Sequence, residues 1–198
     1  MAIRNYDYIS YEQYLNYSKN NKSEYINGEI YMMSPTHPIH NKVQNELYFH
    51  LRSNLKDCSK CDVYTSDIAV KFKNDNEVYQ FEPDVMVVCD NKFDGAIYKG
   101  IPNLVIEVLS TATYDRDLGI KLNIYEQFGV NEYWVVDINK KTITVYSDNI
   151  NGKYTTIKIY SDDVILPIEN LQIKTNEIFN NIWAIKIVAF WIILIYLQ

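Results

Sequence analysis

The sequence has little glycine, little cysteine and no excess of positive charge. Its 198 residues include six glycines and three cysteines, against eighteen tyrosines and 47% hydrophobic residues. This balance excludes a disordered chain and favours strand-rich, well-packed structure, because aromatic side chains suit a pleated surface. A formal net charge of −6 argues against broad, nonspecific attraction to nucleic acid, although it leaves room for a local basic path to an acidic metal site.

The cysteines are Cys58, Cys61 and Cys89. The spacing C-S-K-C of the first two would suit half a zinc site, but the sequence has no second such pair. The N-terminal segment MAIRNYDYIS lacks the apolar stretch of a secretory signal. An odd number of cysteines without such a signal predicts free thiols in a cytoplasmic protein, with a metal or redox role for the pair as the alternative.

One long apolar run lies near the C-terminal end, at 182–197, and only Lys186 interrupts it. Its uninterrupted part, 187–197, is shorter than the ~20 residues that span a bilayer as a helix. A docked helix, a membrane anchor and a segment foreign to the domain all remain open. We therefore predict a single domain over 1–178 and a hydrophobic extension over 179–198, with membrane association through the extension as the minority alternative to a cytoplasmic location.

Hydrophobic periodicity and turn residues predict alternating helices and strands. The expected helices cover 10–19, a segment that His40 opens and in which apolar residues recur every four positions, and 115–128. The expected strands cover 63–72, 85–89, 103–109 and 132–137, with one hairpin turning at Asn27-Gly28 and another across 148–152. The runs at 85–89 and 103–109 are almost wholly apolar, which is typical of central strands covered on both faces. The expected fold class is α/β, a mixed central β-sheet flanked by helices.

Glu107 is an isolated charge within the apolar run LVIEVL. An ionised carboxylate in a buried strand is unfavourable unless it is paired or binds a metal. Strand alternation places Val105 and Leu109 on the same face as Glu107, which argues against a solvated face. A strand-edge glutamate that faces water is the alternative, and we predict a functional carboxylate.

Asp84 follows Pro83 at the start of the apolar run 85–89. Turn aspartates are common after proline, so this position alone distinguishes little. Together with Glu107, however, Asp84 supplies two carboxylates on neighbouring central strands. Mg²⁺ commonly takes a couple of carboxylates and fills its other positions with water and phosphate oxygens. We therefore expect Asp84 and Glu107 to hold Mg²⁺ or Mn²⁺.

Lys121 projects within the apolar stripe of the expected helix 115–128. At 100° per residue, that stripe is marked by Leu118, Leu122, Tyr125 and Phe128. A desolvated ammonium requires an anion, for which Glu107 is a candidate, while snorkelling from the edge of the stripe is the alternative. A lysine beside a metal site can hold the attacking water or stabilise charge that develops on a phosphate.

The order of Pro83-Asp84, Glu107-Val108-Leu109 and then Lys121 resembles the PD-(D/E)xK nuclease superfamily. One departure is plain: Leu109 stands where the lysine usually lies, and one branch of the superfamily carries that lysine on the following helix. The whole set of segments is similar to the Uma2 family of restriction-endonuclease-like proteins: EYINGEIYMMSP at 24–35, His40, EPDVMVV at 82–88, PNLVIEVLS at 102–110, RDL at 116–118, KL at 121–122, Tyr125 and EYWVVD at 132–137. The resemblance covers roughly 11–160.

The resemblance implies a restriction-endonuclease-like core with Asp84 and Glu107 as metal ligands and Lys121 as the catalytic lysine. Glu29 and His40 match further polar positions of the family's pattern and are expected to line the same pocket. Structural roles explain these two residues equally well: Glu29 as a residue just after a hairpin turn, and His40 as a residue at the start of a helix. Tyr125, one turn after Lys121, is a candidate to orient the lysine, with simple core packing as the alternative.

The leading hypothesis is metal-dependent hydrolysis of phosphodiester bonds, and the resemblance implies DNA as the substrate. A basic helix face is a candidate contact for the DNA backbone, with a solvated helix face as the alternative; it comprises Lys42, Arg52, Lys56 and Lys60. A catalytically inactive nuclease-fold protein that acts as a binding or regulatory partner is the first rival, because fold alone does not guarantee activity. A membrane-tethered protein is the second, and a homodimer remains open.

Overall fold

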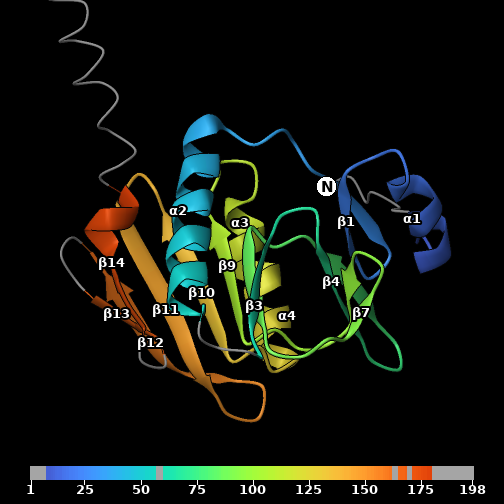
Figure 1. Ribbon diagram of the computed structural model, residues 1–198. Coiled ribbons are helices and arrows are strands. Elements are labelled where there is room, and N and C mark those ends of the chain that lie inside the picture. Colours follow the sequence, from blue (N-terminus) through green and yellow to red (C-terminus); the bar gives the residue numbers. More distant parts are fainter. Residues whose placement is uncertain (1–7, 57–59, 162–164, 169–170, 180–198) are drawn as a thin grey trace, which may run out of the picture.

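The computed structural model describes residues 8–56, 60–161, 165–168 and 171–179, and within these ranges two mixed β-sheets are flanked by helices (Figure 1). The first sheet has the order β12-β11-β10-β9-β6-β3, with β9 and β10 parallel and the other neighbours antiparallel. Its strands are β3 (Asp62–Thr65), β6 (Val85–Val88), β9 (Leu104–Val108), β10 (Glu132–Asp137), β11 (Thr142–Asn149) and β12 (Tyr154–Tyr160). The predicted α/β class is confirmed.

The second sheet has the order β2-β1-β5-β4-β8-β7. Its strands are β1 (Ser23–Ile26), β2 (Glu29–Met32), β4 (Ala69–Lys73), β5 (Val78–Phe81), β7 (Phe93–Asp94) and β8 (Ile97–Tyr98). The hairpin of β1 and β2 turns at Asn27-Gly28, as predicted, with positive φ at both turn residues. A separate hairpin is formed by β13 (Ile165–Ile168) and β14 (Leu171–Lys174).

The helices begin at recognisable caps. α1 (Tyr11–Ser18) starts at Ser10, whose side chain and that of Gln13 form a capping box. α2 (Pro38–Asn54) begins two residues before the expected His40, because Pro38 takes the first helical position and His37 provides the N-cap. The third helical stretch runs through α3 (Tyr114–Arg116), a π-helical turn η1 (Asp117–Lys121) and α4 (Leu122–Gln127), close to the predicted 115–128.

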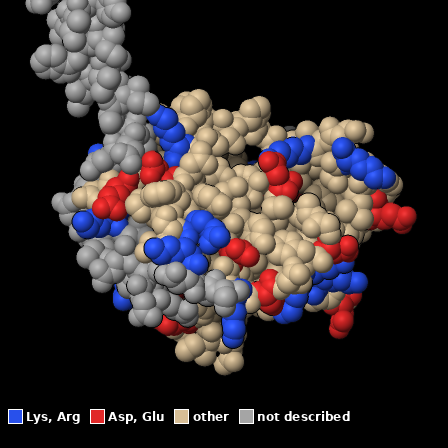
Figure 2. Space-filling model, in the orientation of Figure 1, with Lys and Arg blue, Asp and Glu red and all other residues tan. Residues whose placement is uncertain are grey.

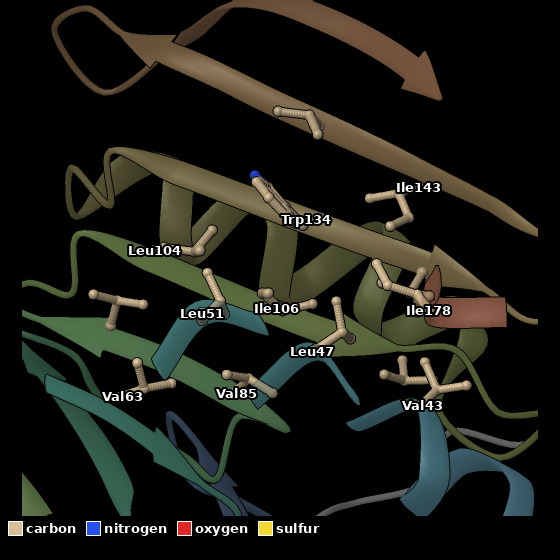
Figure 3. Close-up of a cluster of buried hydrophobic side chains, with 14 of the residues drawn as sticks. Val43, Leu47, Leu51, Val63, Val85, Leu104, Ile106, Trp134, Ile143 and Ile178 are labelled. Atoms are coloured by element: carbon tan, nitrogen blue, oxygen red, sulfur yellow. The ribbon is translucent and has the colours of Figure 1, made fainter. Parts of the chain in front are cut away.

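The first sheet separates two hydrophobic cores. On one face, α2 packs Val43, Leu47 and Leu51 against Leu104 and Ile106 of β9 (Figure 3). On the other face, α4 and the second sheet pack against alternate residues of the same strands, among them Met86, Val105, Tyr133 and Val135. Because side chains alternate along a strand, Glu107 emerges on the α4 face with Val105.

The strand predicted over 63–72 is instead two strands in different sheets. β3 pairs with β6 in the first sheet, whereas β4 pairs with β5 and β8 in the second. The chain turns between them at Asp67, whose φ is 81°. Because apolar residues lie on either side of this turn, the sequence does not reveal that the strand is interrupted there. The short strands β5, β7 and β8 were also not predicted. β5 pairs with β1 and β8 with β4, which are distant in the sequence, whereas β7 is a two-residue strand that pairs with the nearby β8.

The expectation of free thiols is wrong for two of the three cysteines, because Cys61 and Cys89 form a disulfide. Cys61 precedes β3 and Cys89 follows β6, and the antiparallel register pairs Asp62 with Val88. One further step in this register sets Cys61 opposite Cys89, which brings the two sulfurs together. Half of a zinc site at C-S-K-C is excluded for the same reason, since the Cys61 sulfur is bonded; Cys58 lies outside the described residues.

The described chain ends in a helical segment at 175–179, in which Ile178 and Phe179 are buried in the core beneath α2. The body of the protein thus reaches the residue at which the extension was expected to begin. The apolar run at 182–197 lies outside the described residues, as do the interpretations that depend on it. Of the helices in the described ranges, none has both the length and the apolar character needed to cross a membrane.

Candidate active site

Asp84 and Glu107 lie on neighbouring strands, as expected. Val85 of β6 is paired with Ile106 of β9, and one further step in this antiparallel register sets Asp84 opposite Glu107 on the α4 face of the sheet. The backbone N–H of Val108 donates a hydrogen bond of 2.7 Å to Asp84 Oδ2. The strand pairing therefore fixes the position of both carboxylates.

The side chain of Lys121 is buried, with 3% of its surface exposed, so the snorkelling interpretation is wrong. Its Nζ lies 3.0 Å from Glu107 Oε1, which is the predicted pairing. It also lies 2.8 Å from Glu24 Oε1 and 3.5 Å from Asp117 Oδ1. Lys121 ends the π-helical turn, a rare feature that is frequent at functional sites.

Tyr125 is fully buried, and its hydroxyl donates to Glu107 Oε1 at 3.1 Å. Its ring packs against Phe81 and Tyr133, with centroids 5.5 and 5.1 Å away. Tyr125 is thus a core residue that also holds the carboxylate to which Lys121 binds. It contacts the partner of the lysine, whereas the sequence suggested that it would orient the lysine itself.

His40 lies at the cavity, near the N-terminus of α2, with Nε2 3.1 Å from Asp84 Oδ2. Burial alone would lower the pKa of His40, but the hydrogen bond and the charge of Asp84 raise it above its usual value. The next turn of α2 contributes Gln44, whose Nε2 donates to the backbone oxygen of Asp84 at 2.8 Å. Two residues of α2 therefore hold Asp84 at the start of β6.

Glu29 does not line the cavity, contrary to expectation. It is exposed, and its Oε2 accepts a hydrogen bond of 2.6 Å from the hydroxyl of Tyr31. The reason is the register of the hairpin, in which Glu29 pairs with Ile26 beside the turn, whereas Tyr31 pairs with Glu24 two positions further on. Glu24, not Glu29, is the hairpin glutamate that reaches the site.

Glu24 and Asp117 are site residues that the sequence analysis missed, and each is 1% exposed. Glu24 lies in β1, where all four residues are buried, and its Oε1 also accepts the backbone N–H of Glu82 at 3.3 Å. Asp117 lies four residues before Lys121 in the same helical stretch. The one signal for Glu24 was its place in a segment shared with the family, since a short hairpin strand gives no hint of complete burial.

These side chains surround a cavity of about 490 Å³. The charged residues Glu24, Glu82, Asp84, Glu107, Arg116 and Lys121 line it. Its other walls are the segments 32–37 and 109–113, together with residues of α2 and the start of the turn after β10. The three residues predicted to be catalytic thus open into one space large enough for a small ligand or part of a polymer.

Negative charge is in excess in this part of the molecule. Burial raises the pKa of Glu107 well above its usual range; Lys121 opposes this shift, and the nearby carboxylates of Asp117, Asp84 and Glu24 add to it. Burial likewise raises the pKa of Asp117. Burial alone would lower the pKa of Lys121, but the surrounding carboxylates raise it, so the side chain remains an ammonium. One buried cation thus serves several acids, an imbalance that a divalent cation would relieve.

The donor set fits a hard divalent ion held by few protein ligands. Within the described ranges, no three His, Cys, Asp or Glu side chains are arranged as a ready metal site. Mg²⁺ does not require such a cage, because it keeps several waters and is commonly held by one or two carboxylates together with phosphate oxygens. Asp84 and Glu107, opposed across β6 and β9 and facing the cavity, are such a pair.

The arrangement is that of a nuclease fold. The crystal structure of a protein from Anabaena variabilis, described as a putative nuclease belonging to DUF820, matches it with a TM-score of 0.67 and 18% sequence identity, over 82% of this chain and 92% of that one. The chain belongs to the Uma2 family: the family's sequence model, described as "Putative restriction endonuclease", matches residues 11–175. A relative in Synechocystis sp., called "Uncharacterized protein slr1290", is 29% identical over 159 residues, 78% of this chain and 82% of the relative. The predicted family and fold are confirmed.

Proposed function

We propose that this protein is a metal-dependent endonuclease that hydrolyses phosphodiester bonds of DNA. The family description and the fold support a nuclease. One observation carries the proposal further: Asp84, directly before β6, lies opposite Glu107 of β9, and the ammonium of Lys121 lies 3.0 Å from Glu107 at the wall of a cavity. Two carboxylates and an ammonium at one cavity are the groups that metal-assisted phosphodiester hydrolysis requires.

Asp84 and Glu107 would hold Mg²⁺ or Mn²⁺, whose chemistry, when bound, is to acidify a water and polarise a phosphate. The ammonium of Lys121 can donate to the attacking oxygen or to a phosphate oxygen and so stabilise the negative charge of the transition state. Tyr125 and the N–H of Val108 hold Glu107 and Asp84 in place. His40 donates to Asp84 when its Nε2 carries a proton, and it thereby limits the rotation of that carboxylate.

The test is cleavage of supercoiled plasmid and of a duplex oligonucleotide in Mg²⁺, in Mn²⁺ and in EDTA. The parent protein is expected to give nicked or linear products only with the divalent ions. Glu107→Gln, Asp84→Asn and Lys121→Met are each expected to lower the rate by about 100-fold or more, because each removes an interaction with the reacting groups.

Matched controls are Glu12→Gln and Lys158→Met, which change the same residue types at exposed positions in α1 and β12. Both controls should cleave like the parent. Circular dichroism establishes that each variant is folded, and the two carboxylate variants decide the matter should Lys121→Met fail to fold. Absence of metal-dependent products from the parent would leave a nuclease-fold protein without turnover. Equal products from all variants would show that Asp84, Glu107 and Lys121 do not carry the cleavage.

A further inference from the structure

Arg116 brings a second cation to the cavity, and the roles proposed above do not use it. Its side chain is 15% exposed, against 3% for Lys121, so it lies nearer to the opening. It also lies three residues after the segment 109–113 that forms one wall of the cavity. Its position therefore suits contact with a ligand that enters rather than with the buried acids.

The nearest carboxylate neutralises Arg116 only in part. Its Nη1 lies 3.7 Å from Glu24 Oε2, which is longer than a hydrogen bond. The other oxygen of Glu24 is bound more closely by Lys121, at 2.8 Å. Arginine presents five N–H donors in a planar fork that matches the oxygens of a phosphate, and this fork retains donors for an incoming anion.

The guanidinium of Arg116 lies over the ring of Tyr31. Its Cζ lies 4.9 Å from the centroid of the Tyr31 ring, a cation–π contact. The hydroxyl of Tyr31 is in turn hydrogen-bonded to Glu29. A cation–π contact with a ring that is itself held in place restrains the guanidinium. This contact also gives Glu29 a role, because the glutamate positions the ring even though it does not reach the cavity.

The wall next to Arg116 carries hydroxyl groups. Ser110 Oγ and Thr113 Oγ1 are 3.0 Å apart, and the exposed Thr111 between them also lines the cavity. Hydroxyl groups and arginine are frequent partners of the phosphates of a nucleic-acid backbone. Among the described residues, the side chain of Arg116 donates no hydrogen bond, and its longer contact with Glu24 leaves donors available. Such an arginine beside hydroxyl groups, in the same cavity as the carboxylates of Asp84 and Glu107, is suited to such a phosphate.

We propose that Arg116 binds a backbone phosphate of the nucleic-acid substrate at the opening of the cavity, with Tyr31 and Glu29 as positioning residues. The inference rests on the proposed function in taking nucleic acid as the ligand. It assigns to Arg116 the placement of the substrate and leaves the hydrolytic step to Asp84, Glu107 and Lys121.

The basic face of α2 is the competing location for a backbone contact. Arg52 of α2 is exposed, as is Lys56, which follows the end of the helix at Asn54. On the face that Figure 2 shows, basic and acidic side chains of the described residues are interspersed and do not merge into one basic stripe. Arg52 is therefore a matched control for Arg116, an arginine of the same charge outside the cavity.

The experiment measures binding of a fluorescein-labelled 20-base-pair DNA duplex by fluorescence anisotropy, in Ca²⁺ and at several KCl concentrations, with gels to exclude cleavage. Arg116→Gln is expected to weaken binding about tenfold and to reduce the slope of log K against log [KCl] by about one. Arg52→Gln should match the parent. Tyr31→Leu should weaken binding without changing the slope, because the charge remains, and Tyr31→Phe should retain more affinity because it keeps the ring.

The result separates this inference from the proposed nuclease activity. Weaker binding and a reduced slope for Arg116→Gln support the phosphate site even if the parent cleaves nothing. Equal affinity and slope for Arg116→Gln and the parent overturn it even if the parent cleaves DNA. It is also overturned if the parent does not bind the duplex, or if Arg52→Gln loses as much as Arg116→Gln. Thermal unfolding of each variant checks that the fold is retained.

Discussion

The two faces of the first sheet are built from the same strands but differ in chemistry. On the α2 face, the buried core consists of hydrophobic side chains, with Ile106 of β9 at 0% exposure. On the α4 face, the next residue, Glu107, is 3% exposed and is surrounded by Lys121, Glu24 and Asp117. One face maximises apolar burial, which stabilises the fold. The other retains buried charge, which costs stability and is kept where it serves function.

The largest effect is expected on the charged face, from Lys121→Met. This change removes the buried ammonium and leaves several acids without their partner, so the free energy of unfolding should fall by about 3–5 kcal/mol. Urea denaturation measures it. Lys158→Met, at an exposed position, should stay within about 0.5 kcal/mol of the parent. If Lys121→Met is as stable as the parent, Lys121 is not the counter-ion of the buried carboxylates.

Truncation of a side chain on the apolar face is expected to lower the free energy of unfolding slightly less than Lys121→Met does. Leu47→Ala removes a fully buried side chain beneath α2 and should lower the free energy of unfolding by about 2–5 kcal/mol. Since Leu47 does not line the cavity, the cleavage rate per folded molecule should not change. The same denaturation and plasmid assays measure both quantities. A loss of cleavage by folded Leu47→Ala would show that the two faces are coupled.

The smallest effect is a dependence on pH that Glu107→Gln should remove. Burial raises the pKa of Glu107 in the folded protein above the usual 4.5, so the folded state binds this proton more tightly than the unfolded chain. Without a divalent ion, the contribution of Glu107 to stability should therefore fall as pH rises from 4.5 towards its folded pKa.

Thermal unfolding in EDTA across this pH range measures the effect. Glu107→Gln should lose this component of the pH dependence, and Mn²⁺ should stabilise the parent more than it stabilises Glu107→Gln. Glu12→Gln, at an exposed position, should behave like the parent in both respects. Identical pH profiles for the parent and Glu107→Gln would contradict the assignment of the raised pKa to Glu107.

Much of the fold could be predicted because its signals are local. The helix over 10–19 and the turn at Asn27-Gly28 depend on residues a few positions apart. The strand over 132–137 was predicted with its observed bounds. The disulfide of Cys61 and Cys89 could not be predicted, because it depends on the pairing of strands separated by 28 residues of sequence.

The same distinction applies to the site. Glu107 and Lys121 were recognisable because a charge interrupts an apolar strand and an apolar helical stripe. Glu24 was not, because nothing in a four-residue hairpin strand indicates that a distant helix will deliver Lys121 to its carboxylate. Glu29 was wrongly expected at the cavity, because the hairpin register, which places it opposite Ile26 beside the turn, is decided by strand pairing.

By itself, the sequence determined the α/β class, the family and the residue types of the site, because periodicity and isolated charges are properties of neighbouring residues. Only the tertiary structure decided which charges meet. It placed Glu24, Glu107 and Asp117 around one ammonium, and it brought Arg116 to the same cavity. Electrostatic contacts depend on distance in space and on exclusion of water, and both arise only when the sheets and helices pack.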